Sequence, residues 1–207
     1  MDGTTLVDAL TDDLETELSR LGSSKWLYAL TDGEMTGTAV RAAAAADAAA
    51  AADRFESWAA DADDEAAPLF SDLAATAADR RETVDSDTDP APEPADRRTY
   101  ETLAGLDGAA SRLGGALGHS LVTDRTAGQM VGFFVGDADP STAGTFRDLR
   151  SAAADDRDRI VDALDSLCDD EEDWNRARRA ATAVVEAAYE DYVETLESMG
   201  IKPKNVC

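Results

Sequence analysis

The sequence predicts an all-α protein, and two observations support that prediction. Hydrophobic residues make up 43% of the 207-residue chain but aromatic residues only 6%, and alanine is abundant. Alanine is the best helix former, whereas the β-branched and aromatic runs typical of a β-sandwich are scarce. Leucine and alanine also recur at three- and four-residue steps along most of the chain, which is the period of an amphipathic helix. We therefore expect a single helical domain over residues 1–207.

The N-terminal part, residues 1–84, is expected to be helical. Leucines at helical spacing predict an amphipathic helix over residues 4–21, and a short apolar segment follows over residues 25–30. A long Ala-rich helix is expected over residues 35–62, and a further helix over residues 65–84.

Residues 85–96, DSDTDPAPEPAD, carry three prolines and no apolar pattern. This composition predicts an acidic, Pro-rich linker. The linker divides the N-terminal helices from a second helical part over residues 97–200.

The second part begins with a helix near Arg97, which is expected to run or restart as far as the Phe133–Phe134 pair. Three glycines within it either weaken the helix or let another helix approach closely: Gly114, Gly115 and Gly118. A helix over residues 141–168 follows Pro140, which suits a first helical turn.

The last helix is expected from Trp174 to Met199, after an acidic turn at residues 169–173. Gly200 closes this helix and Pro203 prevents its resumption. Two long helices, a long connection and two more long helices are the layout of a ferritin-like four-helix bundle with one crossover. The additional N- and C-terminal helices would pack outside or across that bundle.

The charge of the chain is strongly negative. Nineteen Lys and Arg face 44 Asp and Glu, which gives a formal net charge of -25, and Asp outnumbers Glu about two to one. Such a surface stays hydrated where salt screens the repulsion between carboxylates, and we therefore expect the cytoplasm of an extreme halophile. The rival interpretation, an acidic face for cations or a basic partner, requires carboxylates gathered on one surface, whereas they are spread over every segment. The charge argues against a nucleic-acid partner, which is bound by neutralising phosphates.

The sequence pattern indicates neither a membrane-spanning segment nor a signal peptide. The longest apolar stretch, residues 42–52, is nearly all alanine and carries Asp47. The first residues are acidic and lack the basic and apolar regions of a signal peptide. Cys168 and Cys207 are too few for a disulfide framework. We therefore expect a cytoplasmic protein without a membrane partner.

Candidate catalytic and metal-binding residues are scarce. His119 is the single histidine, no Glu-x-x-His occurs, and no Ser/His/Asp or Cys/His set can be assembled. Residues 85–89 resemble the opening of a calcium loop, but Pro90 occupies the place where that loop needs glycine. We therefore assign no catalytic, cofactor-binding or metal-binding residue, and we interpret His119 as a packing or surface residue.

The C-terminal tail is the least explained feature, because it holds two of the three lysines and a terminal thiol. It is either a flexible end, or a segment docked on its own bundle or inserted into a partner. We expect it to be ordered, and its candidate contact residues are Ile201, Lys202, Pro203, Lys204, Asn205, Val206 and Cys207.

Three stretches carry a resemblance to a known family: LSRLGSSKWLYALTDGEM, QMVGFFVGDADPSTAGTFRDL and AAYEDYVETLESMGIKPKNVC. With the helical order and the acidic composition, they resemble the haloarchaeal rubrerythrin-like proteins of the ferritin-like superfamily. The resemblance covers nearly the whole chain. It implies a four-helix bundle with a di-iron site and peroxide- or oxygen-linked redox chemistry.

The chain departs from the ligand pattern of that family. Where the second bundle helix would carry Glu-x-x-His, the Glu position falls on Arg80 and the His position on Thr83. The equivalent stretch of the later helix, residues 154–159, has no histidine, and only Asp47 and Asp53 are acidic on the Ala-rich helix. No paired cysteines match a rubredoxin-like module.

We therefore expect a non-catalytic ferritin-like bundle without a cofactor, which acts by binding a protein partner or by self-association as a homo-oligomer. The alternative is a rubrerythrin-like di-iron protein that handles peroxide with carboxylate ligands alone. Iron is a cofactor only under that alternative.

Overall fold

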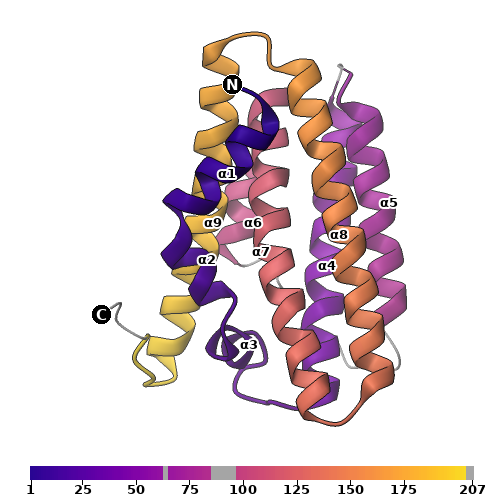
Figure 1. Cartoon of the computed structure of the whole chain (residues 1–207), viewed down its shortest axis with the longest axis vertical. Helices are drawn as coiled ribbons and strands as arrows, with labels where there is room; N and C mark the ends of the chain where they lie inside the picture. The colour runs from indigo at the N-terminus through magenta and orange to yellow at the C-terminus, as the bar shows by residue number, and fades with distance from the viewer. Residues whose placement is uncertain (63–64, 85–96, 204–207) are drawn as a thin grey trace.

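The computed structural model describes residues 1–62, 65–84 and 97–203, and these residues form helices without any strand (Figure 1). The helices are α1 (Gly3–Asp13), α2 (Glu15–Leu21), α3 (Ser24–Leu30), α4 (Gly37–Asp61), α5 (Ala67–Val84), α6 (Arg98–Ala104), α7 (Ala109–Gly136), α8 (Pro140–Leu167) and α9 (Glu171–Ser198). The expected all-α class is confirmed. The linker predicted at residues 85–96, with its calcium-like opening, lies outside the described residues.

Four long helices form two hairpins that lie against each other. α4 packs along α5, and α7 packs along α8. α5 contacts α8, and α4 contacts α7 near one end of the bundle (Figure 1). The expected bounds of α4, α5 and α8 differ from those observed by only one or two residues.

The N-terminal helix predicted over residues 4–21 is in fact two helices. The backbone leaves the helical conformation at Leu14 (φ -108°, ψ 23°), which ends α1 and precedes α2. The break lets each piece bury its leucines against a different surface, since α1 contacts α8 and α9 whereas α2 contacts α7 and α9. Asp2 caps α1 by accepting a hydrogen bond from the Thr5 N–H.

The helix predicted from Arg97 is also divided. α6 ends before Gly105, and α7 starts after Gly108, whose φ of +77° favours glycine. From Ala109 the helix then runs without interruption to Gly136. The sequence left open whether the helix runs on or restarts. It restarts at Ala109, before the glycine cluster and not within it.

α9 packs along α7 as a fifth long helix, and ten of its residues are buried. The contact is close because glycines of α7 face its backbone. A Cβ atom at Gly114 would lie 2.1 Å from the Ala177 carbonyl oxygen, and one at Gly118 would lie 2.5 Å from that of Ala181. The second alternative for these glycines, close helix approach, is the one observed.

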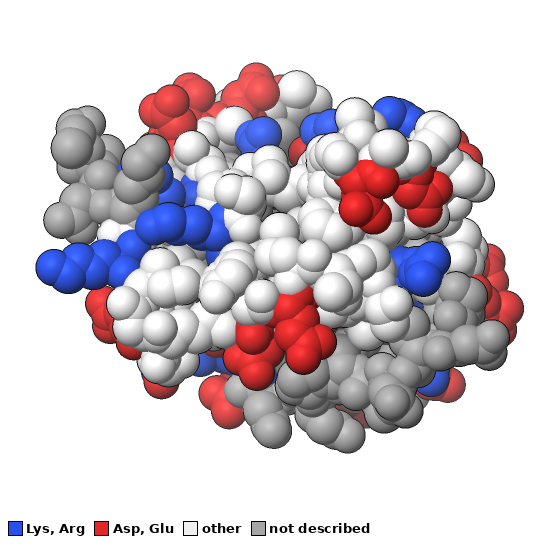
Figure 2. Space-filling model, turned by 90° about the horizontal axis from the view of Figure 1, so that it is seen from below, with Lys and Arg blue, Asp and Glu red and all other residues white. Residues whose placement is uncertain are grey.

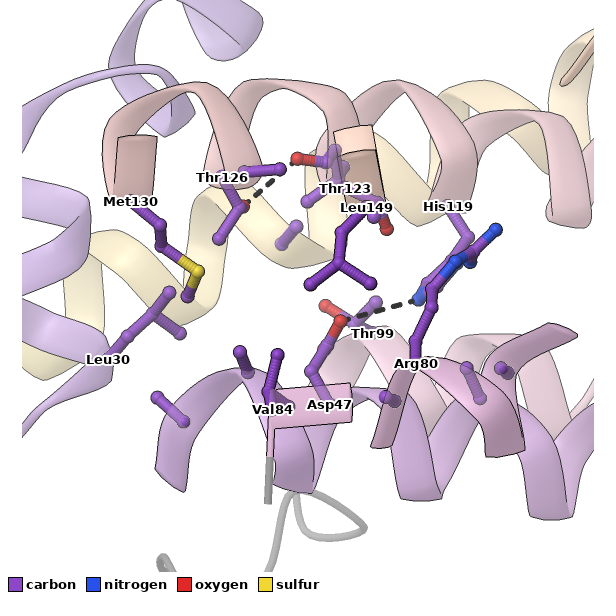
Figure 3. A pocket seen from close by; sticks show the side chains of 18 of the residues that line it. Leu30, Asp47, Arg80, Val84, Thr99, His119, Thr123, Thr126, Met130 and Leu149 are labelled. Carbon is purple, nitrogen blue, oxygen red and sulfur yellow. Dashed lines mark hydrogen bonds and ion pairs between the residues drawn. The ribbon is translucent and has the colours of Figure 1, made fainter. Parts of the chain in front are cut away.

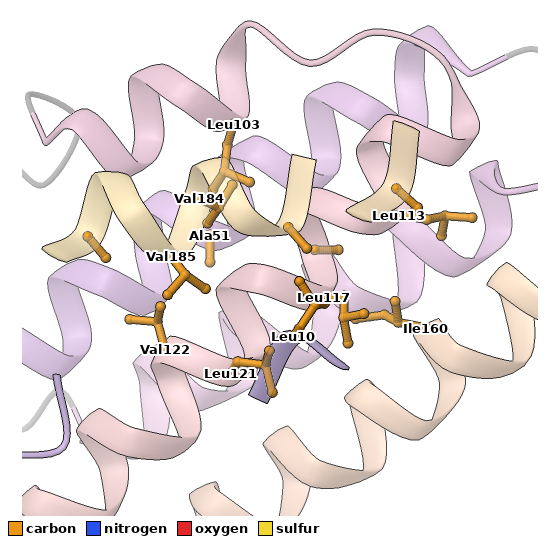
Figure 4. Packing of buried hydrophobic residues seen from close by; sticks show 14 of the residues in the cluster. Leu10, Ala51, Leu103, Leu113, Leu117, Leu121, Val122, Ile160, Val184 and Val185 are labelled. Atoms are coloured by element: carbon orange, nitrogen blue, oxygen red, sulfur yellow. The ribbon is translucent and has the colours of Figure 1, made fainter. Parts of the chain in front are cut away.

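Buried side chains from nearly all the helices join in one large apolar cluster (Figure 4), and a smaller cluster surrounds Phe134 and Phe146. The rings of Phe134 and Phe146 stack with centroids 5.2 Å apart. Trp58 is 1% exposed and packs edge-on against Phe70 at 5.3 Å. The few aromatic rings therefore occupy the space that small side chains leave open.

Candidate functional site

A cavity of about 80 Å³ lies between α4, α5 and α7, with α3, α6 and α8 also contributing to its wall (Figure 3). α7 supplies His119, Thr123, Thr126 and Met130, which follow one another at steps of four, three and four residues. This spacing puts all four on one face of the helix. Polar groups surround the His119 part of the cavity, and apolar side chains surround the Met130 part.

A hydrogen-bonded group of three side chains closes the polar part. The Tyr100 hydroxyl lies 2.8 Å from Asp47 Oδ1, 2.8 Å from the Asp47 carbonyl oxygen and 3.3 Å from His119 Nε2. A phenol has one proton to donate, and the carboxylate is the stronger acceptor. We therefore assign the Tyr100 proton to Asp47, so that His119 Nε2–H donates to the Tyr100 oxygen.

The ionisation of these groups follows from burial. Burial lowers the pKa of His119 below its ordinary 6.5, although the carboxylate of Asp47 opposes the effect. Burial also raises the pKa of Tyr100 well above 10, and Asp47 raises it further. His119 is thus neutral and Tyr100 protonated at neutral pH. The protonated Tyr100 is therefore not a nucleophile, and the neutral His119 is not a charged acid.

An ion pair crosses the bundle beside this group. The Arg80 guanidinium on α5 donates to Asp156 Oδ2 on α8, and Arg159 Nη1 lies 3.5 Å from Asp156 Oδ1. The Asp156 side chain is 8% exposed. Burial raises the pKa of its carboxyl, while both arginines lower it. Arg80 Nε is buried and has no hydrogen-bond partner.

The residues do not fit the di-iron centre that the family resemblance implies. The side chains near one another at this level of the bundle are Asp47, Arg80, His119 and Asp156, one from each of its four helices. A guanidinium is itself a cation and has no lone pair to offer, so it repels a metal ion and cannot act as a ligand. Among the described residues, no group of three or more His, Cys, Asp or Glu is arranged to hold a metal ion.

The other positions considered for ligands point away from the bundle. Thr83 is exposed, and its hydroxyl donates to the Asp79 carbonyl of its own helix. Asp53 is exposed on α4. Of the acidic candidates on α4, the structure brings only Asp47 to the cavity.

The C-terminal tail is described only as far as Pro203. Ile201 packs against the large apolar cluster, and its N–H donates to the Leu196 carbonyl at 2.8 Å. The Lys202 carbonyl accepts a hydrogen bond of 2.9 Å from Lys25 Nζ, while Pro203 is half-buried. Lys204, Asn205, Val206 and Cys207 lie outside the described residues.

Sequence reasoning did not find the role of Tyr100 or the pairing of Arg80 with Asp156. In the sequence, Tyr100 is one of several hydrophobic residues at helical spacing after Arg97. Its two polar partners lie 53 and 19 residues away, and no local pattern encodes them. Arg80 was noticeable in the sequence because a cation stands where the family has a metal ligand. Its partner Asp156 was not, because the chain has many aspartates and nothing local distinguishes this one.

Two large hydrophobic side chains are exposed at one end of the bundle. Met35 is 38% exposed and Val135 is 55% exposed. They flank a contact between α4 and α7, since a Cβ at Gly37 would lie 3.2 Å from the Phe134 ring. Figure 2 shows this end, where neutral side chains cover the centre and acidic side chains lie in separate groups around it.

None of the helices in residues 1–62, 65–84 and 97–203 combines the length and the apolar character that a membrane crossing requires. No protein-family model matches the chain, and comparison with curated proteins and with solved structures finds no match either.

Proposed function

We propose that the chain is a ferritin-like bundle of a halophile's cytoplasm that works by binding and not by catalysis. The proposal is supported by the order of the long helices, in which the α4–α5 hairpin precedes a long connection and the α7–α8 hairpin. We interpret this order as the ferritin-like layout with one crossover, extended by α1 to α3 and by α9.

The pairing of Arg80 with Asp156 inside the bundle carries the proposal. Di-metal bundles place inward carboxylates and histidines from all four helices around two cations. Here the arginine itself supplies the positive charge, and it engages a carboxylate that a metal would need. The alternative, a carboxylate-only di-iron site, would have Asp47 with no second free carboxylate beside it among the residues that the structure describes.

Metal analysis tests this part of the proposal. The protein is purified in molar salt, offered Fe²⁺ or Mn²⁺ without oxygen, and freed of unbound metal by gel filtration. We expect far less than one metal ion per chain, with or without a chelator in the column buffer. Near-stoichiometric iron or manganese that remains through the chelator would overturn the non-catalytic assignment.

Binding, in this proposal, is self-association through the surface around Met35 and Val135. These are two of the three large hydrophobic side chains exposed in the described part of the chain, the third being Met1. Glu34 and Asp137 beside them are exposed as well, so two copies approach closely only where salt screens the repulsion between carboxylates. A protein partner of another kind would use the same surface and is an outcome of the test.

Sedimentation velocity in molar salt tests self-association. We expect the wild type to form a dimer or larger homo-oligomer, and the double variant Met35→Gln, Val135→Gln to sediment as a monomer. The control is Asp169→Asn, Glu171→Gln, which alters the turn between α8 and α9 at the opposite end and leaves assembly unchanged (Figure 1). A wild type that is monomeric at all concentrations contradicts self-association and leaves a different protein as the partner.

A further inference from the structure

The cavity between α4, α5 and α7 is a binding site of a different kind from the surface that self-association uses. We propose that it binds a small molecule without polar atoms, a hydrocarbon of about three or four carbon atoms. The argument rests on the volume of the cavity, on the apolar side chains at one end of it, and on the mutual pairing of the polar groups in its wall.

The volume sets the size of the ligand. The cavity measures about 80 Å³, whereas protein interiors rarely leave a space larger than one water molecule. A single water needs roughly 10–15 Å³, and a dry apolar cavity of about 150 Å³ holds benzene. Scaled from benzene, the space accommodates about three or four carbon atoms. It is too small for a nucleotide or a flavin.

Apolar side chains surround the end of the cavity where the ligand would lie. Leu30, Val84, Met130 and Phe146 come to it from α3, α5, α7 and α8. Figure 3 shows Leu30 and Met130 at the end away from His119. α4 contributes mainly alanines, which are too short to fill the space between these side chains. A hydrocarbon in this space restores the dispersion contacts that the wall atoms lack.

Most polar groups of the wall are bonded to one another. Tyr100 joins Asp47 and His119 in the hydrogen-bonded group described above. Trp26 Nε1–H donates to the Thr126 hydroxyl oxygen at 2.9 Å, and this hydroxyl donates in turn to a carbonyl of its own helix. These groups therefore require no hydrogen bond from a ligand.

Two polar atoms of the wall residues have no hydrogen-bond partner among the described residues, Arg80 Nε and the Thr123 hydroxyl oxygen. Both atoms are buried too deeply to touch the open space, so neither can bind a ligand there. A polar atom of a ligand beside Met130 would lose its hydration without gaining a partner. The wall therefore favours a ligand made of carbon and hydrogen alone.

NMR of the methionine methyl groups tests the proposal. Of the four methionines, only Met130 lines the cavity, so Met1, Met35 and Met199 are internal controls. In protein carrying ¹³C at these methyls, we expect cyclopropane in molar salt to shift the Met130 resonance saturably. The Kd should lie in the millimolar range, as is usual for so small a molecule. The Met130 resonance is identified by its absence from Met130→Leu.

Ethanol is the matched polar probe, because it has as many heavy atoms as cyclopropane. Its hydroxyl loses its hydration in the cavity, so its affinity should be lower by about tenfold or more. Equal or tighter binding of ethanol at Met130 would contradict an apolar site.

Variants that fill the cavity locate the site. Ala43 is buried and lines the cavity from α4, and leucine there adds three carbon atoms. Ala43→Leu should therefore abolish cyclopropane binding, whereas Ala60→Leu, at an exposed position of the same helix, should leave it unchanged. If Ala43→Leu does not fold, Ala127→Val fills part of the space from α7 and should weaken binding several-fold.

Contrary results would overturn the inference. The cavity is not this site if Met130 shows no saturable shift, if the other methionines shift as much as Met130, or if the folded filling variant binds cyclopropane as the wild type does. The metal and sedimentation measurements concern other properties, so a failure here leaves the proposed function standing, and the reverse also holds.

Discussion

Glycine has different roles in the two halves of α7. In residues 109–122, glycines bring the helix against α9, and every residue from Leu113 to Val122 is buried. In residues 123–136, Gly132 and Gly136 have no atom within 4 Å of an added Cβ, and only three residues are buried. The first half packs closely along α9, although His119 also lines the cavity, whereas the second half lines the rest of the cavity and reaches the exposed end. A glycine in a helix therefore indicates close packing only when the structure places a backbone opposite it.

The largest expected effect comes from breaking the first half. Gly114→Ala puts a methyl group within 2.1 Å of the Ala177 carbonyl oxygen, where backbone and not a flexible side chain must move. Overpacking of a core costs about 1–3 kcal/mol and more where the backbone is the obstacle, so we expect the free energy of unfolding to fall by about 3 kcal/mol or more. Denaturant titration followed by circular dichroism in molar salt measures the change. An unchanged midpoint would mean that α7 and α9 are farther apart than described.

A smaller effect is expected where the two halves meet, beside Arg80. Arg80→Met leaves Asp156 buried with only the more distant Arg159, and we expect a loss of about 2–4 kcal/mol in the free energy of unfolding. The double variant Arg80→Met, Asp156→Leu removes both charges and should recover most of that loss. Recovery in the double variant, measured by the same titration, distinguishes an uncompensated charge from lost packing. If the single variant is as stable as the wild type, the pair contributes nothing to folding.

His119, in the same region, gives a dependence on pH. Because burial lowers its pKa in the folded state below 6.5, the unfolded state binds a proton more readily. The free energy of unfolding should therefore decrease as the pH falls below about 6.5. His119→Gln should lack this contribution, so the difference between wild type and variant should change between pH 7.5 and pH 5.5. A constant difference would contradict the neutral, buried histidine.

The smallest effect is a gain in the second half. Gly132→Ala introduces a better helix former at an open position, which should stabilise the protein by about 0.5–1 kcal/mol. In thermal melts, Gly132→Ala should raise the melting temperature and Gly114→Ala should lower it, although both replace a glycine of α7 with alanine. A loss of stability would indicate that residue 132 is covered in solution, as an interface between copies would cover it.

The sequence predicted the long helices well because their periodicity, caps and breakers are local. Gly200 closes α9 as predicted, at φ +73°. The helix starts at Glu171, three residues before the predicted Trp174, because Asp170 caps it within the expected acidic turn. The break at Leu14 could not be predicted, because leucines continue at helical spacing through it and only the surfaces of other helices require it. The partner of α9 could not be predicted for a similar reason, since its pattern shows an apolar face but not that this face packs along α7.

The candidate site was predicted less well than the fold. The sequence showed the loss of metal ligands at Arg80 and Thr83, because Glu-x-x-His is a motif of neighbouring positions on one helix. The Asp47–Tyr100–His119 group and the cavity were not visible, because they depend on side chains from three helices meeting in space. A pattern within one helix states which face is apolar, but not which polar residues of other helices it meets.

The hydroxyl of Tyr100 has a consequence for how the first hairpin is aligned. Alanine fills positions 42–46 and 48–52 of α4, so this stretch of the helix presents almost the same methyl surface in every direction. Methyl contacts alone hardly distinguish one rotation of α4 about its axis from another. Turning α4 by a single residue would detach both of its bonds to Tyr100 and carry Asp47 away from Arg97. A residue of the C-terminal half thus fixes the rotation of the Ala-rich stretch, in addition to the buried Val40, Phe55 and Trp58 on either side of it.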